Sequence, residues 1–186
     1  MDFIKNYLKD LKNKLDELPI DKIEELAAIL ENARKKGKKI FISGNGGSAS
    51  TASHFACDLG KGTVKDHHDI KETRFQVISL LDNMATYTAY SNDFGHDHVF
   101  SQQLCNLVQP GDIVIVITGS GNSKNIIKAV ETAIERKAIT IGFVGFDGGI
   151  LKPMLDHYIH VYSDHYGIVE DVHLILAHMI SYYLMK

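Results

Sequence analysis

The 186-residue sequence predicts a single α/β domain built on a mainly parallel sheet. Strand-like apolar runs alternate with helical patterns at least four times along the chain. The run 113–117 is continuously β-branched, which is typical of a strand that is covered on both faces. Polar turns rich in glycine and serine follow two of the strands, and parallel sheets bind ligands at the carboxyl ends of their strands. We therefore expect the two turns to form a ligand site.

The N-terminal part of the chain predicts two helices. Apolar residues recur at spacings of three and four from Phe3 to Leu15, which is the period of one helix face. A second helix is expected from about Asp21, after Pro19, to a stop at Gly37. Neither helix carries residues typical of catalysis, so we expect both to pack on the domain or against another subunit.

Short apolar runs and helical patterns alternate in the rest of the chain. We expect strands over the apolar runs 39–43, 74–80, 113–117, 140–144 and 158–162. Helices are expected where apolar residues recur with helical period, over 48–60, 83–91, 97–107, 123–136 and 169–184, with a short one after residue 149. The sequence Pro110-Gly111-Asp112 predicts a turn, and the long polar segment 61–73 predicts a loop with a functional role.

Composition and charge argue against several classes of protein. The net charge of −3 gives no reason to expect nucleic acid or an anionic membrane as a partner. No apolar stretch reaches the ~18 residues that a membrane span needs, and the N-terminus lacks the apolar core of a secretory signal. The two cysteines, Cys57 and Cys105, form neither a disulfide framework nor a zinc-ribbon pattern. We expect a cytoplasmic protein.

The two glycine–serine turns, residues 44–48 and 119–123, each join a predicted strand to a predicted helix. Backbone N–H groups, hydroxyls and a helix N-terminus then point at one spot, which suits a phosphate group. For Ser123 alone, phosphate binding and capping of its helix are equally good interpretations. The residues of both turns taken together favour phosphate binding. Neither turn matches a nucleotide-triphosphate loop or a dinucleotide fingerprint. The candidate phosphate-binding residues are Asn45, Gly46, Gly47, Ser48, Thr118, Gly119, Ser120, Asn122 and Ser123.

Two predicted helices carry candidate acid/base groups. His54 and Asp58 are four residues apart on the helix after the first turn, so both lie on one face. The last helix carries Glu170, Asp171, His173 and His178. Asp171 is interpreted as an acid in the first helical turn that interacts with the helix dipole, which is a common arrangement. His178 lies among apolar residues, so it is either a hydrogen-bonded core residue, which its context alone favours, or an active-site group in a dry pocket.

These motifs resemble those of the sugar isomerase (SIS) domain family, and more narrowly those of its phosphoheptose isomerases. The likeness lies in GNGGSA at 44–49, HFA at 54–56, NDFG at 92–95, GNS at 121–123 and EDVH at 170–173, in order along nearly the whole chain. The resemblance implies one SIS domain over 1–186, with a five-stranded parallel sheet in a three-layer α/β/α sandwich. It also implies a homotetramer with active sites between subunits, in which the helices within 1–36 pack.

The resemblance further implies a substrate and a role for individual residues. The substrate would be sedoheptulose 7-phosphate, converted to a heptose 7-phosphate for lipopolysaccharide or capsule. The hydroxyls of the two turns would bind the phosphate of this substrate. Asp93 and Glu170 would also contact the substrate. The implied catalytic residues are Asp58, Glu170 and His178. The implied ligands of one zinc ion per subunit are His54, Asp58, Glu170 and His178.

Two residues depart from the family pattern. Asp58 stands where the family has a glutamate, so its carboxylate reaches ~1.5 Å less, and a displacement of that size can cost about a hundredfold in rate. Glu170 stands where the family has a glutamine, and the potential negative charge should strengthen binding of a divalent cation. Glu170 and His178 are also eight residues apart, about 12 Å along a straight helix, too far for both to reach one zinc ion. Either Glu170 precedes the helical part, or the ligands come from different chains, which we favour slightly.

The resulting hypothesis is a ketose–aldose isomerase that works through an enediol. A carboxylate, Asp58 or Glu170, and the imidazole of His178 would move protons between adjacent carbons and oxygens. One alternative is an isomerase of another ketose phosphate. The other is a non-enzymatic SIS-domain binding protein, like the one that assembles bacterial replication initiators. That relative lacks the acid on the first of these helices and the histidine on the last, whereas this chain has both.

Overall fold

The computed structural model describes residues 2–186 and contains one sheet of five parallel strands. The strands are β1 (Lys39–Gly44), β2 (Gln76–Ser79), β3 (Ile113–Thr118), β4 (Ile139–Val144) and β5 (His157–His160). Their order across the sheet is β2-β1-β3-β4-β5. Each strand overlaps one of the five expected runs, so the predicted α/β class with a parallel sheet is confirmed.

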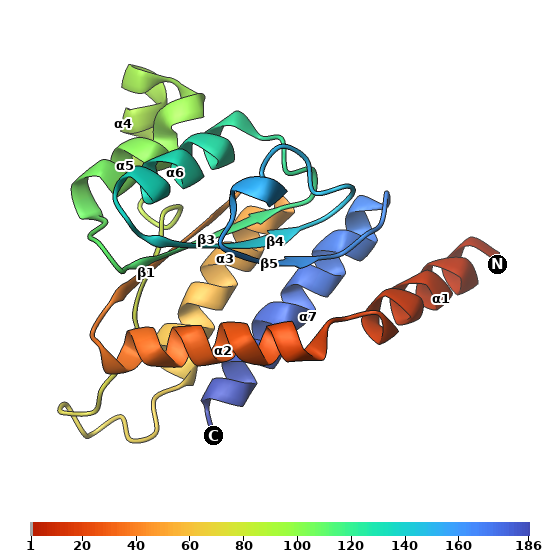
Figure 1. Cartoon of the computed structure of the whole chain (residues 1–186), viewed down its shortest axis with the longest axis horizontal. Helices are drawn as coiled ribbons and strands as arrows, with labels where there is room; N and C mark the ends of the chain where they lie inside the picture. Colours follow the sequence, from red (N-terminus) through yellow and green to blue (C-terminus); the bar gives the residue numbers. More distant parts are fainter. Residues whose placement is uncertain (1) are drawn as a thin grey trace.

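Helices cover both faces of the sheet and complete a three-layer sandwich (Figure 1). One face carries α2 (Ile20–Lys35), α3 (Gly47–Cys57) and α7 (Tyr166–Leu184). The other face carries α4 (Met84–Phe94), α5 (Val99–Leu107) and α6 (Lys124–Glu135). The N-terminal helix α1 (Asp2–Asp16) extends away from the sheet and contacts α7. Within residues 2–186, no helix combines the length and the apolar character needed to cross a membrane.

The side chains of β3 explain why this strand is the centre of the sheet. All six of its residues are buried. Ile113, Ile115 and Ile117 belong to the apolar cluster under α2, α3 and α7, whereas Val114 and Val116 belong to the cluster under α4, α5 and α6. Successive side chains of a strand point to opposite faces, so a continuous β-branched run fills both cores. Each such side chain contributes roughly 1.5–3 kcal/mol when it is fully buried.

The strand order fixes where a ligand can bind. β1 has β2 on one side and β3 on the other, so the chain changes its direction of winding between β1 and β3. In doubly wound sheets the ligand crevice opens at the carboxyl ends of the strands at this switch point. β1 ends at Gly44 and β3 ends at Thr118, and the two glycine–serine turns begin at these residues. The topology therefore brings both turns to the same crevice.

Several helix boundaries differ from the expected ones by a few residues, and two of these differences affect the site. α7 begins at Tyr166, three residues before the predicted start. α3 ends as an α-helix at Cys57 and continues as a π-helical turn, η1 (Asp58–Gly62). Short π-helical turns occur often at functional sites, because they change the direction of the side chains that follow. Asp58 is the first residue of this turn.

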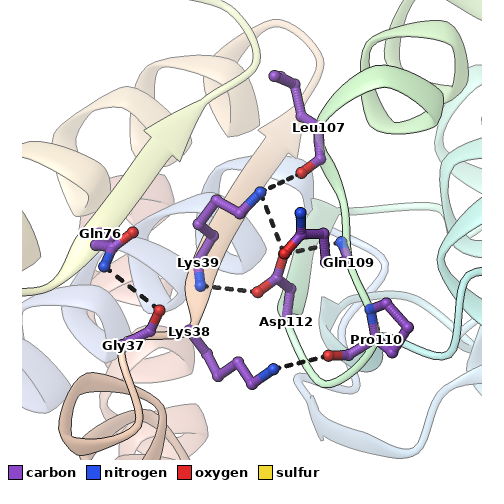
Figure 2. Close-up of polar contacts among 8 residues, drawn as sticks. All are labelled: Gly37, Lys38, Lys39, Gln76, Leu107, Gln109, Pro110 and Asp112. Atoms are coloured by element: carbon purple, nitrogen blue, oxygen red, sulfur yellow. Dashed lines mark hydrogen bonds and ion pairs between the residues drawn. The ribbon is translucent and has the colours of Figure 1, made fainter.

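A network around Asp112 ties β1 to β3 at the end of the sheet opposite to the crevice (Figure 2). The carboxylate of Asp112 is 1% exposed and accepts hydrogen bonds from the backbone N–H groups of Lys39, at 3.0 Å, and Gln109, at 2.9 Å. The Lys39 ammonium lies 3.6 Å from the same carboxylate and also donates to the carbonyl of Leu107. This buried acid therefore satisfies backbone groups of two segments that the sheet must hold together.

The fully buried histidine of the fold is His173, on α7 against Phe143 of β4. Among the described residues, neither of its ring nitrogens has a hydrogen-bond partner of normal geometry. Burial therefore lowers the pKa of His173 to about 4, and a backbone contact with Val144 offsets only part of this effect. The imidazole is neutral in the folded protein at neutral pH.

The lowered pKa of His173 predicts a loss of stability in acid. The folded state binds this proton only near pH 4, whereas an unfolded histidine binds it near its model value of 6.5, so acid favours unfolding over that interval. We expect this residue alone to reduce the free energy of unfolding by about 2 kcal/mol between pH 7 and pH 4.5. Urea titrations of the wild type and of His173→Leu at both pH values measure the difference. Equal acid sensitivity of the two proteins would contradict the assignment.

Candidate active site

A pocket of about 130 Å³ opens at the switch point between β1 and β3. Its wall is formed by Asn45, Ser48, Ile117, Thr118, Gly119, Ser120, Ser123, Tyr166 and Glu170. The first glycine–serine turn and α3 supply one side, and the second turn supplies the other. The two turns thus meet in the structure, and α3 and α6 direct their N-termini, with their partial positive charge, to this end of the sheet.

The hydroxyls of the second turn are arranged to donate. Ser123 precedes the first residue of α6, but among residues 2–186 its hydroxyl caps no backbone N–H of that helix. The hydroxyl of Thr118 accepts from the N–H of Gly121, and that of Ser120 accepts from the N–H of Asn122, both at 3.2 Å. A hydroxyl that accepts one hydrogen bond still has its own proton to donate. These three hydroxyls therefore suit a phosphate, which offers only acceptors.

The turns need glycine for two physical reasons. Gly46 and Gly121 have φ values of +56° and +64°, which side chains rarely tolerate. A Cβ on Gly121 would also lie 2.1 Å from the carbonyl oxygen of Gly148. A side chain at this position would therefore push the second turn away from the β4 side of the pocket.

A second constellation lies where α3 passes into its π-helical turn. The side chains of His54, Asp58 and His178 bring three potential ligand atoms within 4.8 Å of one another. The two Nε2 atoms are 3.4 Å apart, and the Oδ2 of Asp58 lies 3.5 Å from His54 and 3.8 Å from His178. The imidazole rings meet edge to face, with their centroids 4.9 Å apart. We refer to these three residues as the acid/base cluster.

The acid/base cluster fits a zinc ion. Zinc takes imidazole nitrogen at about 2.0–2.1 Å in tetrahedral geometry, which separates two ligand nitrogens by about 3.4 Å. The two Nε2 atoms already stand at this separation, and a carboxylate oxygen lies within a few tenths of an ångström of it. Two nitrogens and one oxygen leave a fourth position open, which is typical of catalytic rather than structural zinc sites.

Comparison with known proteins identifies the family of this sequence. A family model described as the SIS domain matches residues 3–145. A probable phosphoheptose isomerase of Thermoplasma acidophilum is 38% identical over 176 residues, which cover 95% of this chain and 94% of that protein. The chain belongs to the SIS domain family. A phosphoheptose isomerase of Shewanella denitrificans is 35% identical over 178 residues, covering 93% of this chain and 88% of the relative.

A solved structure extends the comparison to the SIS fold itself. The phosphoheptose isomerase of Francisella tularensis superimposes with a TM-score of 0.87 at 28% identity, over 98% of this chain and 94% of that one. The likeness therefore includes α1 and α7 as well as the segment that the family model matches.

Glu170 lies apart from the acid/base cluster of this SIS domain. Its carboxylate lies against Gly47 at the start of α3. A Cβ added to Gly47 would be only 2.4 Å from the Oε2 of Glu170. Of the two alternatives for Glu170, the one in which it precedes the last helix is wrong, because α7 begins at Tyr166 and Glu170 is in its second turn. Within one chain Glu170 therefore lines the pocket rather than joining His54, Asp58 and His178. Metal ligands from different chains remain a prediction.

His178 and Asp93 also lie in surroundings that the sequence did not indicate. The side chain of His178 is 40% exposed, so the expectation of a dry apolar environment is wrong, and the buried histidine of this helix is His173. Asp93 is exposed in the last turn of α4 and accepts a hydrogen bond from Asn92 at 2.9 Å. It lies outside the pocket lining, so its contact with a substrate remains a prediction.

Three residues near the site were not predicted. Tyr166 packs on Gly119 at the mouth of the pocket, and no sequence pattern marks it. Tyr7 of α1 donates a 2.6 Å hydrogen bond to Asp171, and this bond raises the pKa of Tyr7 to about 12. Asn125 is buried and forms hydrogen bonds with Asn45. Its position two residues after Ser123 was the sequence signal that could have placed it near the pocket.

Proposed function

We propose that this chain is a phosphoheptose isomerase that converts sedoheptulose 7-phosphate to D-glycero-D-manno-heptose 7-phosphate. The observation that carries the proposal is the shared geometry of α3 and α7. Both helices line the phosphate pocket near their N-termini, through Ser48 and Glu170, and both contribute to the acid/base cluster further along. One anion-binding end and one proton-transferring end are what the isomerisation of a sugar phosphate requires.

The pocket would bind the phosphate and orient the rest of the sugar. Hydroxyls of Ser48, Ser120 and Ser123 donate to its oxygens, and the N-termini of α3 and α6 add partial positive charge. Binding energy from the phosphate is remote from the reacting carbons, so it can be used to hold them in a reactive geometry. The same residues distinguish a sugar phosphate from a free sugar.

The acid/base cluster would move the protons. Isomerisation transfers one proton from C1 to C2 and another from the hydroxyl on C1 to the oxygen on C2, through an enediol. Asp58 and His178 form a carboxylate–imidazole pair, with 3.8 Å between Oδ2 and Nε2, and such a pair can take a proton at one carbon and return it at the next. This contact supports Asp58, rather than Glu170, as the carboxylate.

His54, Asp58 and His178 are also the residues that would hold a zinc ion. When bound, zinc supplies positive charge that stabilises the negative oxygen of the enediol. In this proposal His54 acts only as a ligand, and Asp58 and His178 are the groups that transfer protons.

We further propose a cytoplasmic homotetramer with active sites between subunits. The described residues of α1 include none that is buried, and Phe3, Ile4 and Leu8 are 71%, 67% and 60% exposed. Apolar side chains on one helix face at this exposure suit contact with a second copy of the chain. Glu170 of the pocket and His178 of the cluster are eight residues apart, about 12 Å along α7, which leaves room for a residue of a neighbouring subunit between the two ends of the site.

An isomerase assay across ketose phosphates tests the proposal. We expect purified, zinc-loaded protein to convert sedoheptulose 7-phosphate with a kcat/KM at least about tenfold above those for five- and six-carbon ketose phosphates. Unphosphorylated sedoheptulose is the matched control and should react poorly, because the pocket then contributes no binding energy. Preference for a shorter ketose phosphate would reject the substrate but keep the reaction. Absence of turnover with every ketose phosphate would indicate a binding protein instead.

A further inference from the structure

A pair of asparagine side chains joins the two halves of the crevice. The Nδ2 of Asn45 donates to the Oδ1 of Asn125 at 2.9 Å, and the Nδ2 of Asn125 donates to the Oδ1 of Asn45 at 2.9 Å. Asn45 belongs to the first glycine–serine turn and lines the pocket, whereas Asn125 is the second residue of α6 and is 1% exposed. The reciprocal pair therefore holds a pocket residue through a buried partner that does not line the pocket.

The direction of such a pair depends on a third group. If both amides rotated by half a turn, each would still donate one hydrogen bond and accept one, so the pair alone allows two orientations. His96, on the short helix η2 (His96–His98), supplies the missing contact. Its Nε2 lies 3.4 Å from the Nδ2 of Asn125 and 3.1 Å from the hydroxyl of Tyr87. In the tautomer that carries its proton on Nδ1, His96 accepts at Nε2 from the amide N–H of Asn125, sharing this acceptor with the Tyr87 hydroxyl, and Nε2 would repel an amide oxygen in the rotated arrangement.

The orientation of the pair decides what Asn45 can offer to a ligand. With Asn125 directed by His96, the Oδ1 of Asn45 is engaged by Asn125. One N–H of Asn45 is used by the pair, and the second N–H remains as a donor. In the rotated arrangement the positions of oxygen and nitrogen are exchanged. A phosphate offers only acceptors, so an amide oxygen in place of the donor would weaken its binding.

We propose that His96 and Asn125 are positioning residues, which act through Asn45 to keep an amide N–H available to the phosphate of the substrate. The inference rests on the proposed function for the identity of that substrate, but its anion-binding part can be measured separately. We call the chain of polar contacts through His96, Asn125 and Asn45 the relay. It runs from α4 to the pocket, because the hydroxyl of Tyr87 of α4 contacts His96.

The same segment offers a matched control. His98 lies two residues after His96, and its Nε2 contacts the ammonium of Lys128 at 2.7 Å, so it joins η2 to α6 without touching the asparagine pair. Asp97 makes a looser contact, 3.8 Å from Lys124. A substitution at His98 therefore disturbs the packing of η2 on α6 but leaves the relay in place.

The test compares His96→Phe, His96→Gln and His98→Phe. We measure inorganic phosphate binding by calorimetry, and kcat and KM for sedoheptulose 7-phosphate. His96→Phe removes the acceptor and keeps a ring, so we expect the phosphate Kd and the KM to rise about tenfold, the value of one hydrogen bond to a charged group, with kcat changed less than about threefold. His96→Gln restores an acceptor and should return both constants to within about threefold of wild type. His98→Phe should leave both unchanged.

Several outcomes would overturn the relay. Equal effects of the substitutions at His96 and His98 would mean that η2 acts only by packing. A loss confined to kcat, or no rescue by glutamine, would also contradict it. If His96→Phe does not fold, His96→Ala is the second variant, because it also removes the acceptor, and an unchanged phosphate Kd in that protein contradicts the relay. If phosphate affinity responds as expected but no ketose phosphate is converted, the relay holds and the proposed function fails.

Discussion

Replacing Asp58 with asparagine is expected to lower kcat/KM for sedoheptulose 7-phosphate by about a thousandfold. The amide cannot accept the proton that the carboxylate removes, and general acid–base groups contribute about 10²–10⁴ in rate. The same substitution removes the negatively charged oxygen ligand beside His54 and His178. We therefore also expect the zinc content per subunit to fall. Steady-state kinetics and elemental analysis of the purified variant measure the two effects independently.

Two further variants show whether the effect belongs to this carboxylate. Asp58→Glu keeps the charge and adds one methylene, so it should retain zinc and lose no more than about a hundredfold in rate. Glu135→Gln removes an exposed acid at the end of α6, far from the acid/base cluster, and should leave both measurements unchanged. Activity of Asp58→Asn above about a tenth of wild type would place the proton-transferring carboxylate elsewhere. Full activity of protein without bound metal would show that catalysis does not require zinc.

Most of the fold could be predicted because its signals are local. The β-branched run of β3 needs both faces buried, and the glycines in the turns after β1 and β3 permit the tight connections into α3 and α6. Glycine–serine turns also predicted the phosphate pocket, since parallel strands end at one edge of a sheet. In each case the physical requirement is met by residues that are adjacent in the sequence.

The parts of the site that could not be predicted depend on contacts between distant elements. Apolar neighbours of His178 suggested a dry environment, yet helical periodicity gives the buried position to His173 and leaves His178 facing α3. The π-helical turn at Asp58 has no sequence signature, and the position of Glu170 follows from an earlier start of α7 than its apolar pattern indicated. Asn125 acquires its partner 80 positions away in the chain.

Replacing Asp112 with alanine is expected to lower the free energy of unfolding by about 3 kcal/mol. The carboxylate is 1% exposed and is the acceptor for the backbone N–H groups of Lys39 and Gln109 (Figure 2). Alanine would leave both groups without a partner in a buried position, and each unsatisfied group costs about 1–3 kcal/mol. Urea unfolding at pH 7 measures the change as a lower midpoint with an unchanged m-value.

A second variant separates the backbone contacts from the ion pair. Lys39→Met removes the ammonium, 3.6 Å from Asp112, but keeps the backbone N–H that donates to the same carboxylate. The lysine side chain is a quarter exposed, and solvent screens such pairs, so we expect a loss of less than about 1 kcal/mol. If the methionine variant is destabilised as much as the alanine variant, the ion pair and not the backbone acceptor holds β1 to β3. Because this network lies at the end of the sheet opposite to the crevice, neither substitution should change the KM for the substrate.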